Sequence, residues 1–171
     1  MFTSVHLHLA LNHLPIIATA LGLVLMVTAA WRRDDYLGRV SFAFLAGSAL
    51  SALPTYLSGE SAEGAVERLP GVTEALIDTH SDIAIIAAIV VGVLGAFALW
   101  ALWRYRRPAI LPRSVVLVAL SGALVGSGLM AYAGLLGGQI RHTEVRPGYI
   151  PASKDASDAR GPSARGPAFD R

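Results

Sequence analysis

Four long apolar runs separated by polar segments dominate the pattern along the chain. They cover residues 14–31, 40–59, 83–103 and 114–140, and none contains Asp, Glu, Lys, Arg or His. A helix that crosses a bilayer needs about 17–25 mainly apolar residues, so each run is long enough to span. The strands of a membrane β-barrel would instead alternate polar and apolar residues in short segments. The pattern therefore predicts an all-α integral membrane protein, a four-helix bundle.

Composition agrees with this class and narrows the chemistry. Charged residues make up 15% of the chain, against about a quarter in ordinary soluble domains. We expect the first run to be a span rather than a cleaved signal peptide, because no Lys or Arg precedes Arg32. The absence of cysteine excludes disulfides, thiolate metal ligands and c-type haem attachment.

The arginines of the loops predict the orientation. They lie in loops one and three, at Arg32, Arg33, Arg39, Arg104, Arg106, Arg107 and Arg113. Loop two carries Arg68 against the acidic residues Glu60, Glu63, Glu67, Glu74, Asp78 and Asp82. Because Lys and Arg favour the cytoplasmic side, we expect a bacterial inner-membrane protein with loop two and both termini in the periplasm. An aromatic belt of Trp31, Tyr36, Trp100, Trp103 and Tyr105 then marks the inner interface.

The polar segments after the second and fourth runs have different expected structures. Loop two has Glu60, Glu63 and Glu67 at helical spacing, which predicts a short interfacial helix ended by Pro70 and Gly71. After it, Thr73 can cap a helix that continues into the third span. Residues 147–171 are rich in Pro, Gly, Ser and mixed charge, which predicts a disordered periplasmic tail behind a transmembrane domain of residues 1–146. The mixed charge gives no sign of nucleic-acid binding.

All five histidines fall at the predicted outer ends of the spans. His13 opens the first span, His80 opens the third and His142 follows the fourth, while Glu60 closes the second. His80 shares a helix face with Leu76, Ile83 and Ala87. Imidazole is a common ligand of haem iron, zinc and copper, so His13, Glu60, His80 and His142 are the predicted metal ligands.

Two stretches give these histidines a polar setting. In the first, "LNHLPI", Pro15 either stands in the first turn of a helix or kinks a helix that begins earlier and frees the Leu11 carbonyl. Asn12 could cap that helix or orient a ligating imidazole. In the second, "GGQIRHTE", the cofactor-binding candidates Gln139, Arg141 and Glu144 crowd the exit of the last span. There Arg141 is suited to pair with Glu60 or Glu63, or with a haem propionate.

The stretches "LNHLPI", "SGESAEGAVERLPG…THSD" and "GGQIRHTE" resemble an uncharacterised bacterial family of small four-span membrane proteins, a domain of unknown function with Asn-His-x-Pro and Gly-Gly-x-x-x-His patterns. The resemblance covers most of residues 1–147 and excludes the tail. It implies no established activity, although a related family is sometimes fused to cytochrome c-like domains. The family pattern points to Asn12, His13, Pro15, Glu60, His80, Gly137, Gly138, Arg141 and His142. His6 and His8 are less central to this pattern.

Three functions fit these features. The first is a redox protein that binds b-type haem through outer-side histidines, either His13 with His80 or His80 with His142. It would transfer electrons at the periplasmic face to a respiratory or periplasmic redox partner. The second is a non-haem site for copper, zinc or iron, and the third is a cofactor-free assembly subunit. Ionisable groups inside a membrane bundle favour the first two. The lipid bilayer is a partner in each case, and a homo-oligomer is compatible with all three.

The orientation can be tested by labelling single cysteines in intact spheroplasts. A membrane-impermeant maleimide should modify Ser163→Cys in the tail and leave Asp35→Cys in loop one unmodified, because loop one is predicted to be cytoplasmic. The reverse labelling pattern would contradict the orientation and move the histidines to the other side of the membrane.

Overall fold

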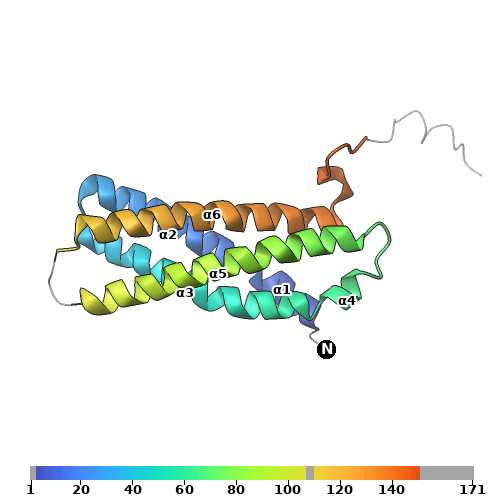
Figure 1. Cartoon of the computed structure of the whole chain (residues 1–171), viewed down its shortest axis with the longest axis horizontal. Helices are drawn as coiled ribbons and strands as arrows, with labels where there is room; N and C mark the ends of the chain where they lie inside the picture. The colour runs from blue at the N-terminus through green and yellow to red at the C-terminus, as the bar shows by residue number, and fades with distance from the viewer. Residues whose placement is uncertain (1–2, 107–109, 151–171) are drawn as a thin grey trace, which may run out of the picture.

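The computed structural model describes residues 3–106 and 110–150. All regular secondary structure in this part of the chain is helical, and it contains no strands (Figure 1). Most of the predicted disordered tail, from residue 151 onward, lies outside the described residues. The elements in chain order are α1 (Ser4–Leu11), α2 (His13–Arg32), α3 (Asp35–Glu60), α4 (Glu63–Val66), α5 (Glu74–Arg104), α6 (Arg113–Arg141) and the 3₁₀ helix η1 (Thr143–Val145). Four stretches are long and apolar enough to cross a membrane: Ser4–Arg32, Asp35–Glu60, Glu74–Arg104 and Arg113–Arg141. The prediction of an all-α membrane bundle is confirmed.

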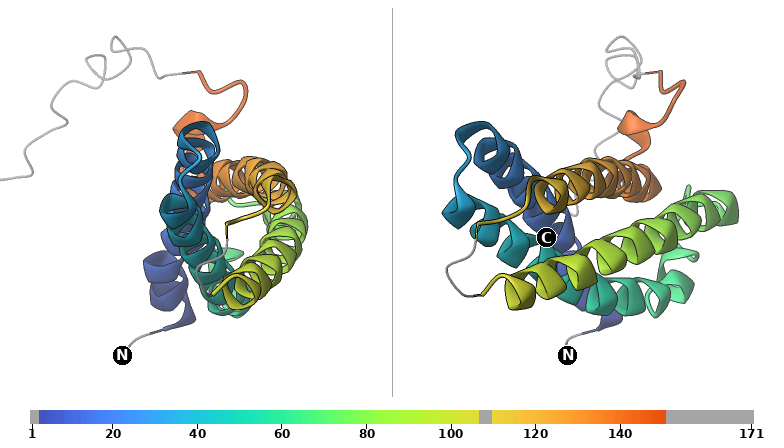
Figure 2. Two further views of the ribbon diagram at one scale, coloured as in Figure 1. Left: turned by 90° about the vertical axis from the view of Figure 1, so that its left-hand side faces the viewer. Right: turned by 60° about the vertical axis from the view of Figure 1, so that its left-hand side comes forward.

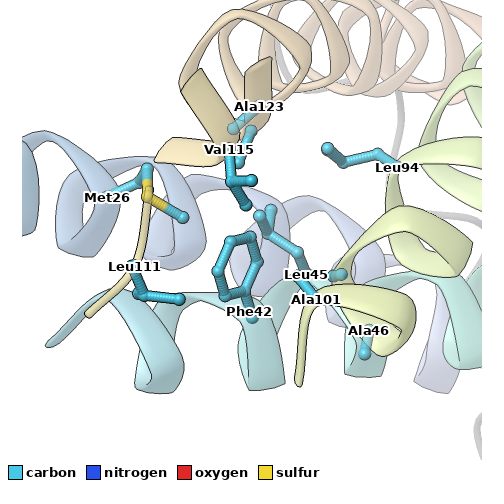
Figure 3. Packing of buried hydrophobic residues seen from close by; sticks show 11 residues of the cluster. Met26, Phe42, Leu45, Ala46, Leu94, Ala101, Leu111, Val115 and Ala123 are labelled. Carbon is cyan, nitrogen blue, oxygen red and sulfur yellow. The ribbon is translucent and has the colours of Figure 1, made fainter. Parts of the chain in front are cut away.

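The four long helices form a closed ring. α2 packs against α3 and α6, α5 packs against the same two helices, and consecutive helices run antiparallel (Figures 1 and 2). Near the loop-one and loop-three end, the ring is filled by a compact apolar cluster that includes Met26, Phe42, Leu45 and Val115 (Figure 3). That end of the bundle is therefore solid.

Small residues determine how closely the helices approach. A Cβ added at Gly22 would meet Leu45 Cδ2 at 2.7 Å, and one added at Gly95 would overlap the Ala49 side chain. The space at these glycines is taken up by the neighbouring helix, as is common in membrane interfaces. The pairs Gly22–Leu45 and Gly95–Ala49 bring α3 close to α2 on one side and to α5 on the other.

The helix break in "LNHLPI" has a definite structure. α1 ends at Leu11 and α2 begins at His13, with Asn12 between them in helical backbone geometry. Pro15 has no N–H to offer the Leu11 carbonyl. The nearest donor to this carbonyl is Thr55 Oγ1 of α3 at 3.3 Å, whose one proton is shared with the Ser51 carbonyl at 2.8 Å. α1 packs mainly against α3 (Figure 1). The helix therefore starts upstream of Pro15, and α1 is an additional element that the hydropathy pattern did not predict.

Further hydrogen bonds between α2 and α3 are made by hydroxyl groups deeper in the bundle. The Pro15 carbonyl accepts hydrogen bonds from Thr19 Oγ1 at 2.7 Å and from Ser48 Oγ at 2.9 Å. The two hydroxyls lie 2.6 Å apart, and both side chains are fully buried. Threonine and serine thus join α2 to α3 where the apolar core gives way to more polar contacts.

The helix in loop two is shorter than predicted. α4 covers only Glu63–Val66, and the chain then turns through Gly71, whose φ is 77°. Thr73 occupies the N-cap position of α5 with extended backbone, but its side chain makes no capping hydrogen bond. The interfacial helix is therefore a single turn, and the second part of the loop is irregular.

The two ends of the bundle differ in charge as the loops predict. Loop one, Arg104 and Arg113 lie at the end filled by the apolar cluster, and loop two lies at the opposite end with α1 and η1 (Figure 1). Trp31 and Tyr36 are 83% and 73% exposed at the arginine end, where an aromatic belt is expected. Which end faces the cytoplasm stays a prediction.

The close contact of α3 and α5 predicts a contrast between two glycines of one helix. Gly95→Ala should lower the free energy of unfolding by about 1–3 kcal/mol, because the added methyl group overlaps Ala49 and the core is overpacked. Gly92→Ala should not lower it, because a Cβ at Gly92 meets nothing within 4 Å and alanine has the higher helix propensity. Thermal unfolding of both purified variants in detergent measures the difference, and equal melting temperatures would contradict the proposed contact.

Candidate functional site

A cavity of about 640 Å³ lies at the end of the bundle opposite the arginine loops. Its walls come from α1, the start of α2, the end of α3, the start of α5 and the end of α6. Cofactor sites are typically apolar hollows of roughly 300–1,000 Å³ with a few polar groups, and the cavity fits this description. Its polar lining includes His8, Asn12, His13, Glu60, Glu63, His80, Arg141 and His142. Of the predicted site residues, Gln139 and Glu144 alone do not line it.

His80 is held by the helix that faces it. Its Nδ1 lies 3.0 Å from the Ala133 carbonyl of α6. A carbonyl can only accept, so Nδ1 carries the proton and donates, and Nε2 of the neutral ring keeps its lone pair. His80 lines the cavity with Ile77, Ala84 and Ala87 of the same helix, whereas the predicted neighbours Leu76 and Ile83 do not.

His8 makes the same contact on the other side of the bundle. Its Nδ1 donates to the Thr55 carbonyl of α3 at 3.0 Å, so its Nε2 is also the free nitrogen. His8 and His80 both line the cavity. Two imidazoles of matching tautomer thus reach one cavity from the α1–α3 and α5–α6 helix pairs.

A glycine makes room for each ring. A Cβ added at Gly59 would meet His8 Cε1 at 2.9 Å, and one added at Gly137 would meet His80 Cε1 at 3.0 Å. Each glycine lies one helical turn after the residue whose carbonyl accepts the imidazole proton, Thr55 in α3 and Ala133 in α6. The same arrangement of histidine, carbonyl and glycine therefore occurs twice.

His13 and His142 are placed differently from the predicted ligands. His13 lines the cavity at its exposed edge. The side chain of His142 is 64% exposed, and its Nδ1 lies 2.9 Å from Glu144 Oε1. Hydrogen bonds from its own backbone and from His142 hold the pKa of Glu144 below its ordinary value. Glu144 therefore bonds to His142 and does not line the cavity.

The described residues do not group the predicted metal ligands. Within residues 3–106 and 110–150, no three His, Cys, Asp or Glu side chains are positioned to hold one metal ion. His13, Glu60, His80 and His142 line one cavity but do not form one ligand set. In the same part of the chain, Arg141 is not within ion-pair distance of Glu60 or Glu63, so the expected pairing is not formed.

Arg146, which the sequence did not single out, ties loop two to the end of α6. Its guanidinium group donates to the carbonyls of Gln139 at 2.7 Å, Ile140 at 3.0 Å and Gly71 at 2.9 Å. An arginine just beyond a helix commonly satisfies the last carbonyls of that helix. The position of Arg146 shortly after the fourth span was therefore the sequence signal for this contact. The contact fixes loop two beside the cavity and uses Gln139 through its backbone.

His8 is the other residue that the sequence reasoning missed. The signal was the apolar stretch around it, Val5 to Leu11, which continues the first span upstream of Asn12. Asn12 itself is notable, because its Oδ1 is buried and makes no hydrogen bond within the described part of the chain. This atom is an acceptor available to a donor in the cavity.

The packing of His80 on Gly137 predicts a contrast between adjacent glycines. Gly137→Ala should be less stable than Gly138→Ala by about 1 kcal/mol, because only the first methyl group presses on the His80 ring and disturbs a buried hydrogen bond. A Cβ at Gly138 meets nothing within 4 Å. Both changes raise helix propensity equally, so the difference in unfolding free energy reports the ring contact. Equal stability of the two variants would show that His80 does not pack there.

Comparisons with known proteins give the family. No curated protein and no solved structure matches the chain. The family model described as "Predicted membrane protein (DUF2231)" matches residues 4–144, which include all the helices from α1 to α6 and every residue that lines the cavity. The chain therefore belongs to the DUF2231 family of predicted membrane proteins.

Proposed function

We propose that this membrane protein binds b-type haem between His8 and His80 and transfers electrons at that end of the bundle. The observation that carries the proposal is the pair of imidazoles that enter one cavity from different helix pairs. Each donates Nδ1–H to a backbone carbonyl and leaves Nε2 free. Ligating histidines generally donate their second nitrogen in this way, which fixes the ring orientation.

The number of available ligands favours haem over a bare metal ion. Zinc sites in proteins use three or four side-chain ligands, and the described residues offer no such group. Haem iron takes its equatorial ligands from the macrocycle and needs only axial ligands from the protein. Two imidazoles are therefore sufficient.

The remaining lining suits a flat, largely apolar group with an acidic edge. Ala52, Ala84, Ala87 and Met130 give the cavity apolar walls. Arg141 lies on the lining without an ion pair in the described residues and can bind a carboxylate such as a propionate. The buried Asn12 Oδ1 offers an acceptor.

In this proposal the chain's own residues hold and tune the cofactor. The carbonyls of Thr55 and Ala133 fix both imidazoles, and the apolar walls exclude water. Axial ligands and burial set the potential of a haem iron. If the arginine end is cytoplasmic, the site faces the periplasm of a bacterial inner membrane and exchanges electrons with a respiratory or periplasmic partner. His8 thus takes the ligand role that the sequence gave to His13 or His142.

Absorption spectra of the purified protein, oxidised and reduced, test the ligand pair. The protein should contain haem with a b-type difference spectrum, and His8→Ala and His80→Ala should each abolish that spectrum, because alanine cannot replace an axial ligand. His6→Ala on the same helix and His142→Ala should retain it, since His6 does not line the cavity and the His142 side chain is mostly exposed and bonded to Glu144.

Other outcomes distinguish the alternatives. Stoichiometric copper, zinc or iron without a Soret band, lowered by His13→Ala and His80→Ala, would replace the proposal by a non-haem site. A stable folded preparation that contains neither haem nor metal would favour a cofactor-free assembly subunit. Haem that survives His8→Ala but not His142→Ala would restore one of the two pairs predicted from the sequence, His80 with His142.

A further inference from the structure

Loop two forms one wall of the cavity that holds the histidines. Residues 63–72, which we call the lid, contain α4 and the irregular segment that follows it. Glu63, Val66 and Leu69 of the lid line the cavity, yet α4 packs extensively on none of the other helices. The lid therefore bounds the cavity without being part of the bundle.

Few hydrogen bonds hold the lid in place. In the part of the chain that the structure describes, its backbone hydrogen bonds run between residues 62 and 72 of the loop itself. The bond that joins the lid to another element is donated by Arg146 Nη1 to the Gly71 carbonyl, at 2.9 Å. Gly71 is exposed and has a φ of 77°, which glycine adopts without strain. Segments with few contacts and few hydrogen bonds open at a low cost in free energy, so this bond is the one that opening must break.

The end of α6 orients Arg146 for this contact. Its Nε donates to the Gln139 carbonyl at 2.7 Å and its Nη2 to the Ile140 carbonyl at 3.0 Å. Both carbonyls belong to the last turn of α6, where helical donors are missing. The guanidinium group is planar and holds its donors in a rigid fork, so the two bonds to α6 fix the direction of the third. Breaking the bond to Gly71 alone would free the lid and leave Arg146 on α6.

We propose that residues 63–72 are a lid that opens to admit and release the group bound in the cavity, and that Arg146 is its latch. The other walls of the cavity come from helices that pack on one another, so the lid is the wall that moves at the least cost. Ile140 also lines the cavity, and the latch thus joins two walls of one site. The inference rests on the proposed function only for the identity of the bound group, which would be haem.

Access to the cavity can be measured by a thiol reaction on the full-length protein in nanodiscs. The chain has no natural cysteine, and Ala84→Cys places one in the α5 wall of the cavity. A cationic methanethiosulfonate reagent, which stays in water, then reports how often the cavity is open. Adding Arg146→Gln should raise the reaction rate about tenfold, because the lid loses a hydrogen bond from a charged donor.

Arg68→Gln is the matched control. Arg68 lies in the lid, but its side chain makes no hydrogen bond or ion pair within the described residues and does not line the cavity. In the Ala84→Cys background it should leave the reaction rate unchanged. Equal acceleration by Arg68→Gln and Arg146→Gln would assign the effect to the lost positive charge and overturn the proposal, as would an unchanged rate in Arg146→Gln.

Amide hydrogen exchange on the same variants separates the lid from the bundle. Arg146→Gln should leave exchange in α5 and in α6 before Gly138 unchanged, because their helical hydrogen bonds do not involve Arg146. Faster thiol reaction together with faster exchange throughout both helices would make Arg146 a support of the whole bundle, and this result would also overturn the proposal.

Haem release is a separate readout. In haem-containing protein, Arg146→Gln should speed the transfer of haem to apomyoglobin and keep the b-type difference spectrum, because the bonds of His8 and His80 to Thr55 and Ala133 remain. A preparation without haem in which Arg146→Gln still accelerates the thiol reaction would refute the proposed function and keep the lid. Haem bound by His8 and His80 with an unchanged thiol rate would refute the lid and keep the proposed function.

Discussion

Backbone carbonyls and N–H groups inside a bilayer must find partners within the protein, and this requirement organises the histidine end of the bundle. Pro15 leaves the Leu11 carbonyl without its helical donor, and the nearest donor to it is Thr55 of α3. Ser48 of α3 donates to the Pro15 carbonyl. These bonds run from α3 to the segment where α1 meets α2, so satisfying the break also fixes the position of α1. With α1 held against α3, His8 can donate its Nδ1–H to the Thr55 carbonyl.

Glycine and alanine decide where the bundle is solid and where it is hollow. At Gly95 and Ala49 the helices touch through their smallest side chains, and the apolar cluster around Phe42 fills the adjacent end. At Gly59 and Gly137 the space next to each helix is taken by an imidazole from a neighbouring helix. Small residues thus serve close packing in the middle of the membrane and ring placement near its surface.

The chemistry of the cavity depends on hydrogen bonds in its wall and beside it. The Thr55 and Ala133 carbonyls select one tautomer in His8 and His80, in which Nε2 keeps its lone pair. Arg146 joins Gly71 of loop two to the last carbonyls of α6, so the loop that carries the acidic residues is held beside the site. The match to the DUF2231 family model includes all of these positions except Arg146, which lies two residues past its end.

The amino-acid sequence by itself determined the membrane class, the four spans, the separation of arginines from histidines and the end at which a site could lie. These properties follow from local hydropathy and from charges along the chain, which do not depend on how helices pack. Six of the predicted site residues line the cavity: Asn12, His13, Glu60, His80, Arg141 and His142.

Only the tertiary structure decided which imidazoles line the cavity while bonded to the carbonyl of a neighbouring helix, and these are His8 and His80. The positions of these two rings depend on the helix break at Asn12, which leaves α1 against α3, and on the glycines of α3 and α6 that make room for the rings. His142 lies just past the end of α6, where its ring meets Glu144 and is exposed. Side-chain direction depends on helix breaks and on contacts between residues such as 8 and 55 that are far apart in the chain, and hydropathy and local spacing contain no information on those contacts.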